Sequence, residues 1–314
     1  MSPLWIVASI GPPLLLMGYG LFKARDRWSS PALWCALVAG IGMAGVAVPV
    51  ENFIETHLAL GGPLPTESAL RAGLYAFLVA AAPEEALKMA GLLFAMMVLD
   101  GKRLRSVVMV SIAVAMGFAA IENTLYLIQA GADWKSVAWL RGGASVPIHG
   151  VCGLMMGALI VGTIANDVTR WFGLLLALLV PIALHGTFDA LLMMSGPHVA
   201  DFKMPAVVLA MLGGGVLAVA LCNRALDAAA REEGGNDIGG PLGGGMRTAV
   251  KRAARIYLGI VFVPVILGRF QPEAMWNASL LAVLPAVLTF DVLFSRPRKP
   301  LLSGDKEWIR VGPA

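Results

Sequence analysis

Apolar segments long enough to cross a bilayer recur along this chain, and they constrain its fold more than any other feature. A spanning helix needs about 20 predominantly apolar residues. Only 14% of the 314 residues are charged, whereas about a quarter are charged in soluble proteins. The sequence therefore predicts an all-α polytopic membrane protein with about nine transmembrane helices. The expected spans are 3–22, 31–50, 69–99, 106–129, 139–165, 171–194, 205–222, 254–270 and 274–294.

Lys and Arg residues are distributed unequally between the segments that connect these spans. Assigning the connections alternately to two sides places 18 of the 24 on one side and five on the other, and Lys88 lies within a span. Because cytoplasmic loops are enriched in Lys and Arg, we expect the N-terminus outside and the C-terminus in the cytoplasm. The net charge of +4 gives no indication of a nucleic-acid partner.

The composition divides the chain into three regions. Residues 1–222 are expected to form a transmembrane domain. Residues 223–255 are interpreted as a cytoplasmic Gly-rich linker with a basic segment, which lies along the anionic inner leaflet or is simply solvated. Residues 256–314 should add two further transmembrane helices and a basic cytoplasmic tail. The three cysteines lie in or at the end of apolar segments, and we interpret them as packing residues.

Ionisable residues inside four of the predicted spans are the strongest indication of function. At mid-helix an acid or a lysine costs about 2.5–3.5 kcal/mol, so four acids and one lysine would cost roughly 12–18 kcal/mol if isolated. They must therefore pair with one another or line a polar cavity. The residues concerned are Glu84, Glu85, Lys88, Glu122, His149, His185 and Asp189.

The spacing of these residues favours convergence. Glu84 and Glu85 lie four and three residues before Lys88, so all three share one helix face. His185 and Asp189 are also four residues apart. From their depths along the spans, the acids and histidines should meet between the midplane and the outer leaflet. Pro83 removes a helical hydrogen bond, and we expect a break there that leaves the two glutamates in the first turn of a second half-helix.

These residues together resemble the PrsW family of intramembrane proteases, a branch of the superfamily that includes the CAAX prenyl endopeptidases. The family pattern is EExxK, FxxxEN, a histidine, and HxxxD, and the match covers about residues 70–195. Members are regarded as glutamate-dependent proteases, and metalloprotease assignments have also been made. The matching positions are Glu84, Glu85 and Lys88, then Phe118, Glu122 and Asn123, then His149, and finally His185 and Asp189.

The resemblance implies a mechanism and a substrate. Glu84, with Glu85, would activate a water that attacks a peptide carbonyl. His185 would polarise the developing oxyanion, with Asp189 near it. His149 is assigned the water-holding role that a second-motif histidine, absent here, has in the CAAX branch. The implied substrate is a single-pass membrane protein, such as an anti-sigma factor, cut near the outer face of a bacterial inner membrane without a metal cofactor.

Other interpretations of the same residues remain open. Lys88 is expected to balance charge, and Glu122 and Asn123 either take part in function or clamp two helices together. Zinc hydrolysis with His149, His185 and a carboxylate is the first alternative. A proton- or ion-coupled transporter and a non-enzymatic scaffold are the others. Four further ionisable residues are placed in solvated outer loops: Glu51, Glu55, His57 and His198.

Overall fold

The computed structural model describes residues 3–24, 31–61, 64–98, 104–165, 169–196 and 200–232. This part of the chain is helical apart from its turns and one isolated bridge between Thr66 and Met194. The helices are α1 Pro3–Ala24, α2 Pro31–His57, α3 Ala69–Leu74, η1 Tyr75–Ala81, α4 Ala82–Val98, α5 Leu104–Ala130, η2 Gly131–Asp133, α6 Trp134–Leu140, η3 Arg141–Ser145, α7 Val146–Ala165, α8 Arg170–Met193 and α9 Ala200–Glu232.

The all-helical character predicted from the sequence is confirmed for the described residues. Three helical stretches are long and apolar enough to cross a membrane: Pro31–His57, Ser106–Ala165 and Trp171–Met193. Shorter apolar helices cover Leu4–Gly18 and Leu209–Ala225. Each of the first seven predicted spans coincides with helix. The predicted spans 254–270 and 274–294 lie outside the described residues, so the count of nine stays a prediction.

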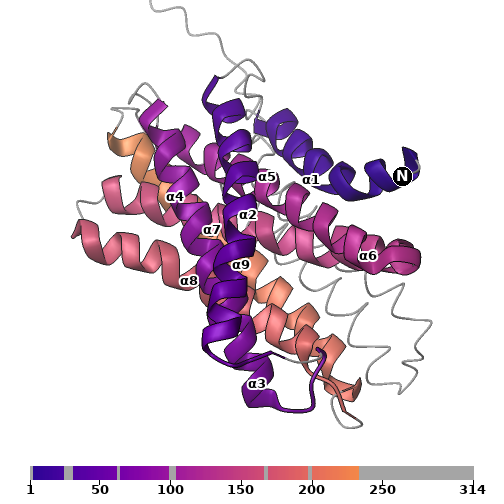
Figure 1. Ribbon diagram of the computed structural model, residues 1–314. Coiled ribbons are helices and arrows are strands. Elements are labelled where there is room, and N and C mark those ends of the chain that lie inside the picture. Colours follow the sequence, from indigo (N-terminus) through magenta and orange to yellow (C-terminus); the bar gives the residue numbers. More distant parts are fainter. Residues whose placement is uncertain are drawn as a thin grey trace, which may run out of the picture.

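α5 and α7 form the centre of the helical assembly. α5 packs against α1, α2, α4 and α7, and α7 also packs against α8 and α9. In Figure 1, α2 and α4 run side by side, while α1 and α6 extend together to one side of them. Large apolar side chains such as Leu15, Trp34 and Trp171 are exposed on α1, α2 and α8. Such outer faces suit contact with lipid.

Two helices extend beyond their predicted ends. α2 continues to His57 instead of ending at residue 50, so Glu51, Glu55 and His57 lie on a helix and not in an outer loop. α9 continues to Glu232, so the first ten residues of the expected linker 223–255 are helical. His198 and the remainder of that linker lie outside the described residues. The corrections arise because the spans were delimited by apolar composition, whereas a helix can continue into polar sequence.

Glycines permit the close crossing of α2 and α5. A methyl group at Gly40 would collide with the backbone carbonyl of Val114, and one at Gly117 would collide with the carbonyl of Leu37. In a bilayer, helices associate through such close packing because lipid supplies no hydrophobic drive between them. The crossing holds α5, which carries part of the site described below, firmly against α2.

Replacing Gly40 should therefore destabilise the fold, whereas a matched change nearby should not. We expect Gly40→Ala to lower the free energy of unfolding by about 1–3 kcal/mol, because the added methyl group overpacks the crossing. Gly42 lies on the same helix with nothing within 4 Å of an added Cβ. Gly42→Ala should be neutral or stabilising, since Ala favours helix by about 1 kcal/mol over Gly. Thermal unfolding of both variants in detergent tests this, and equal shifts would contradict it.

Candidate active site

The two adjacent glutamates lie where a widened helical turn passes into α4. η1 is a π-helix, and the N–H of Ala82 bonds to the carbonyl of Phe77, five residues earlier. This geometry accommodates Pro83 without breaking the helix, so the predicted break is replaced by a π segment. Such segments are frequent at functional sites. As predicted, Glu84 and Glu85 lie in the first turn of the helix that follows.

Lys88 is the central cation of the site. Its Nζ lies 3.1 Å from Glu84 Oε2, 2.8 Å from Glu85 Oε1 and 2.8 Å from His149 Nδ1. It also lies 4.4 Å from the centroid of the Phe118 ring. The side chain is 2% exposed. The expectation that Lys88 balances the charge of the two glutamates is consistent with these contacts.

The contacts of His149 fix which of its nitrogens carries hydrogen. An ammonium group has only donors, so Nδ1 must accept the hydrogen bond from Lys88. Nε2 then carries the hydrogen and lies 2.7 Å from Glu122 Oε2, an ion-pair distance without hydrogen-bond geometry. Both ring nitrogens are thus in contact with a charged group. His149 lies on α7 and therefore links Lys88 of α4 to Glu122 of α5.

His185 lies among three carboxylates. Its Nδ1 is 2.8 Å from Glu85 Oε1, and its Nε2 is 3.3 Å from Asp189 Oδ2 and 4.0 Å from Glu84 Oε2. Its ring meets that of His149 edge to face, with centroids 4.9 Å apart. α8 is thereby joined to α4 and α7, and the four motifs form one connected network.

Arg141 is a member of this network that the sequence analysis missed. It was counted among the residues of the outer connections, yet it is buried at 7% exposure. Its Nη2 lies 2.7 Å from Glu122 Oε1 and its Nε donates to Asn123 Oδ1 at 2.8 Å. Its position in an apolar, Gly-rich stretch eight residues before His149, about two helical turns, could have indicated it.

Asn123 serves a different purpose from the acids beside it. Its Nδ2 donates to the backbone carbonyl of Ser9 on α1 at 3.0 Å, while its Oδ1 accepts from Arg141. The side chain is fully buried. Asn123 therefore fits the predicted interhelical clamp, whereas Glu122 belongs to the network that contains Lys88 and His149.

A polar cavity of about 280 Å³ gives access to this network. Its lining includes Glu84 and Glu122, together with Glu51, Glu55 and Tyr126. The assignment of Glu51 and Glu55 to solvated outer loops was wrong, because α2 brings both to the wall of this cavity. The wrong assignment followed from ending α2 too early.

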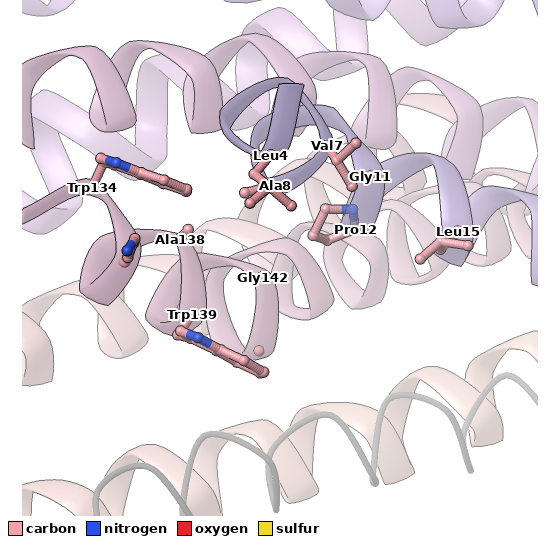
Figure 2. A pocket seen from close by; sticks show the side chains of 12 residues that line it. Leu4, Val7, Ala8, Gly11, Pro12, Leu15, Trp134, Ala138, Trp139 and Gly142 are labelled. Atoms are coloured by element: carbon pink, nitrogen blue, oxygen red, sulfur yellow. The ribbon is translucent and has the colours of Figure 1, made fainter. Parts of the chain in front are cut away.

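A second, larger cavity has a different character. It measures about 540 Å³ and lies between α1 and α6, where Trp134 and Trp139 face Leu4 and Pro12 (Figure 2). Among the described residues that line it, Lys135 is the one charged side chain, and none is an acid or a histidine. Groups capable of acid–base chemistry therefore line the smaller cavity and not this one.

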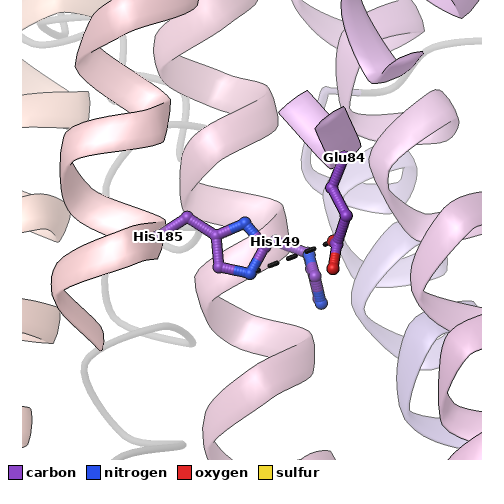
Figure 3. Close-up of side chains that lie close together, drawn as sticks. All are labelled: Glu84, His149 and His185. Atoms are coloured by element: carbon purple, nitrogen blue, oxygen red, sulfur yellow. Dashed lines mark ion pairs between the residues drawn. The ribbon is translucent and has the colours of Figure 1, made fainter. Parts of the chain in front are cut away.

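Glu84, His149 and His185 could be considered as metal ligands. One ligand atom from each lies within 4.8 Å of the others, and Figure 3 shows the three side chains converging. Two imidazoles and a carboxylate are a donor set that zinc uses in catalytic sites. However, the Lys88 ammonium already binds Glu84 and His149, and a divalent cation there would meet this buried charge. The site fits zinc by donor type but not in its observed arrangement.

Comparisons with known proteins give a consistent result. A family model described as "PrsW family intramembrane metalloprotease" matches residues 16–219. "Protease PrsW" of Shouchella clausii is 29% identical over 209 residues, covering 66% of this chain and 92% of that protein. The Halalkalibacterium halodurans protein of the same name is 27% identical over 65% of this chain and 90% of its own. That of Bacillus subtilis is 37% identical over 26% of this chain and 36% of its own. No solved structure matches.

The Arg141 contacts generate a stability prediction. Arg141→Met leaves one oxygen of the Glu122 carboxylate, which is 15% exposed, without its cation, and breaking a buried ion pair costs about 3–5 kcal/mol. We expect a large fall in the thermal unfolding temperature. The matched change Lys135→Met, on exposed α6, should have little effect. Adding Glu122→Gln to Arg141→Met should recover part of the loss, and a double variant no more stable than Arg141→Met would contradict the pairing.

Proposed function

Because this chain belongs to the PrsW family of intramembrane proteases, we propose that it cleaves a membrane-anchored protein with a water activated by Glu84. The observation that carries this proposal is the position of the Glu84 carboxylate. Its Oε2 bonds to Lys88, whereas its Oε1 has no partner among the described residues and Glu84 lines the polar cavity. A fixed carboxylate with one free oxygen facing a cavity is the arrangement that a general base requires.

The chemistry follows from these positions. Glu84 takes a proton from a water molecule in the cavity as the water oxygen attacks the carbonyl carbon of the scissile bond. A tetrahedral intermediate forms, and its oxyanion needs a donor in a water-poor site. The donor we propose is His185, which lies behind the cavity lining with Nε2 4.0 Å from Glu84 Oε2. Glu85 holds its Nδ1, and its Nε2 would exchange the contact with Asp189 Oδ2, at 3.3 Å, for the oxyanion. Glu84 then returns the proton to the leaving nitrogen as the carbon–nitrogen bond breaks.

Glu85 has a positioning role in this proposal. Its Oε1 accepts from both Lys88 and His185, and the residue is fully buried. It does not line the cavity, so it cannot receive a proton from a water there directly. We assign it the task of holding the Lys88 ammonium and the His185 ring on either side of Glu84.

The water-holding role predicted for His149 stays a prediction, and the contacts favour another task. Both of its nitrogens are engaged, by Lys88 and Glu122. Of these three side chains, Glu122 is the one that reaches the cavity wall. We therefore propose that His149 fixes the other two residues and that Glu122 contributes to the placement of the water.

The substrate and the setting are part of the same proposal. The charge distribution of the loops supports an N-terminus outside and a C-terminus in the cytoplasm, with nine spans in the cell membrane. A site in the outer half of that membrane suits a single-pass substrate of the anti-sigma-factor type. Membership of a protease family argues against the transporter and scaffold alternatives.

Replacing the proposed base should remove activity and leave the fold intact. We expect Glu84→Gln to reduce cleavage of a single-pass substrate by about 10²–10⁴-fold, the usual contribution of general base catalysis. The amide keeps a hydrogen-bonding oxygen for Lys88, so the unfolding temperature should change little. Glu67→Gln, in the exposed segment before α3, is the matched control and should cleave as well as the unchanged protein. Full activity of purified Glu84→Gln would refute the proposal.

Zinc hydrolysis is the second candidate, favoured by the proximity of Glu84, His149 and His185. Under the leading proposal, activity should persist after strong chelation, and the purified protein should contain far less than one zinc per chain. Elemental analysis and cleavage assays in detergent measure both. Inhibition by a chelator that added zinc reverses would favour the metal instead.

A further inference from the structure

The cavity wall contains acids that the proposed hydrolysis does not use. Glu51 and Glu55 lie one turn apart near the C-terminal end of α2, and both line the cavity with Glu84 and Glu122. None of its described lining residues is a lysine, an arginine or a histidine. Both acids are half-buried, so water screens their charge less than it would on an exposed surface.

The cations nearby are already committed to other acids. Lys88 is shared between Glu84 and Glu85, and Arg141 binds Glu122. Among the described residues, Glu55 has only the Tyr75 hydroxyl, at 3.1 Å from its Oε2, and Glu51 has no cationic partner. Glu51 and Glu55 therefore line the cavity without a cation paired to either among the described residues.

Two further observations indicate that these acids face a ligand. Glu84, only 4% exposed and with no hydrogen-bond partner at Oε1 among the described residues, lines the same cavity. Tyr126, also in the lining, already holds a guanidinium 3.9 Å from its ring centroid, that of Arg141. An aromatic side chain of this lining is thus already in contact with a cation.

The size of the cavity limits what can enter. At about 280 Å³ it lies just below the range of cavities that hold drug-sized ligands, about 300–1,000 Å³. It has room for a side chain and a short stretch of backbone but not for a whole helix. A substrate must also bring its scissile bond to Glu84, so a neighbouring side chain is the part that would reach Glu51 and Glu55.

We infer that Glu51 and Glu55 form a subsite for a lysine or arginine side chain next to the scissile bond of the substrate. The inference rests on the proposed function for the identity of the ligand as a peptide. The long apolar stem of such a side chain would cross the apolar part of the lining, and its charged end would pair with the two carboxylates. Tyr75 orients Glu55 for this contact.

Cleavage and binding of matched substrates test the inference separately. Single-pass peptides carry Lys, Met or Glu at each position flanking the cleaved bond, and cleavage is measured with the unchanged protein. Binding of the same labelled peptides is measured with Glu84→Gln, in which cleavage is blocked. We expect Lys peptides to exceed Met peptides about tenfold in both assays at the responsive position, which corresponds to 1.4 kcal/mol.

Substitutions in the subsite should change this preference. Glu51→Gln and Glu55→Gln should each bring the Lys-to-Met ratio towards one, and Glu51→Lys should invert it in favour of the Glu peptide. The control Glu67→Gln removes the same charge outside the cavity and should keep the ratio of the unchanged protein. The Gln variants keep the shape of the side chain, and their unfolding temperatures show that they are folded.

The outcomes separate the inference from the proposed function. Equal binding of Lys and Met peptides at every position would overturn the inference. A Lys-to-Met ratio that stays the same in Glu51→Gln and Glu55→Gln would also overturn it. If the peptides bind with the expected preference but Glu84→Gln cleaves as well as the unchanged protein, the proposed function fails and the subsite stands. If Glu84→Gln is inactive and no preference exists, the proposed function stands and the subsite fails.

Discussion

The buried ammonium of Lys88 is the interaction on which the site depends. It contacts carboxylates on its own helix and an imidazole on α7, and those groups extend to α5 and α8. Charges removed from water are tolerated only when paired and hydrogen-bonded. The ion pairs of this network join the helices that carry its groups, although Glu85 Oε2, Glu122 Oε2 and Arg141 Nη2 are buried without a hydrogen-bond partner. Stability and reactivity therefore share one set of residues.

This sharing distinguishes the roles of two adjacent glutamates. Each glutamate keeps one oxygen without a hydrogen-bond partner, but Glu85 is fully buried and outside the cavity lining, whereas Glu84 lines the cavity. Neighbouring positions on a helix differ by about 100° in direction, so one side chain points into the protein and the other towards the cavity. In the proposed function Glu85 therefore positions its neighbours and Glu84 acts as the base, and both carboxylates bind Lys88.

Sequence reasoning predicted the helical membrane architecture and the convergence of the four motifs, because the cost of isolated charge in lipid leaves few alternatives. It missed Arg141, Glu51 and Glu55 for a common physical reason. Each lies near a predicted span end, where composition cannot distinguish a charge facing water from one facing the protein interior. The helix lengths decide that, since α2 continues to His57 and the segment 106–165 is helical throughout. The sequence analysis predicted a helix break at Pro83, because proline removes one helical hydrogen bond. The structure instead has a π-helical segment just before Pro83. The missing hydrogen bond alone does not determine which of these two arrangements forms.

The two π-helical segments have a consequence for how this architecture tolerates length changes. η1 directly precedes α4 with Glu84 and Glu85, and η3 directly precedes α7 with His149. A turn closed over five residues holds one residue more than an α-helical turn. Removing that residue would restore ordinary helix and rotate everything beyond it by about 100°. Each segment therefore acts as an angular spacer, so a one-residue deletion in η1 would turn the acids of α4 away from the site, and one in η3 would turn His149 away from it.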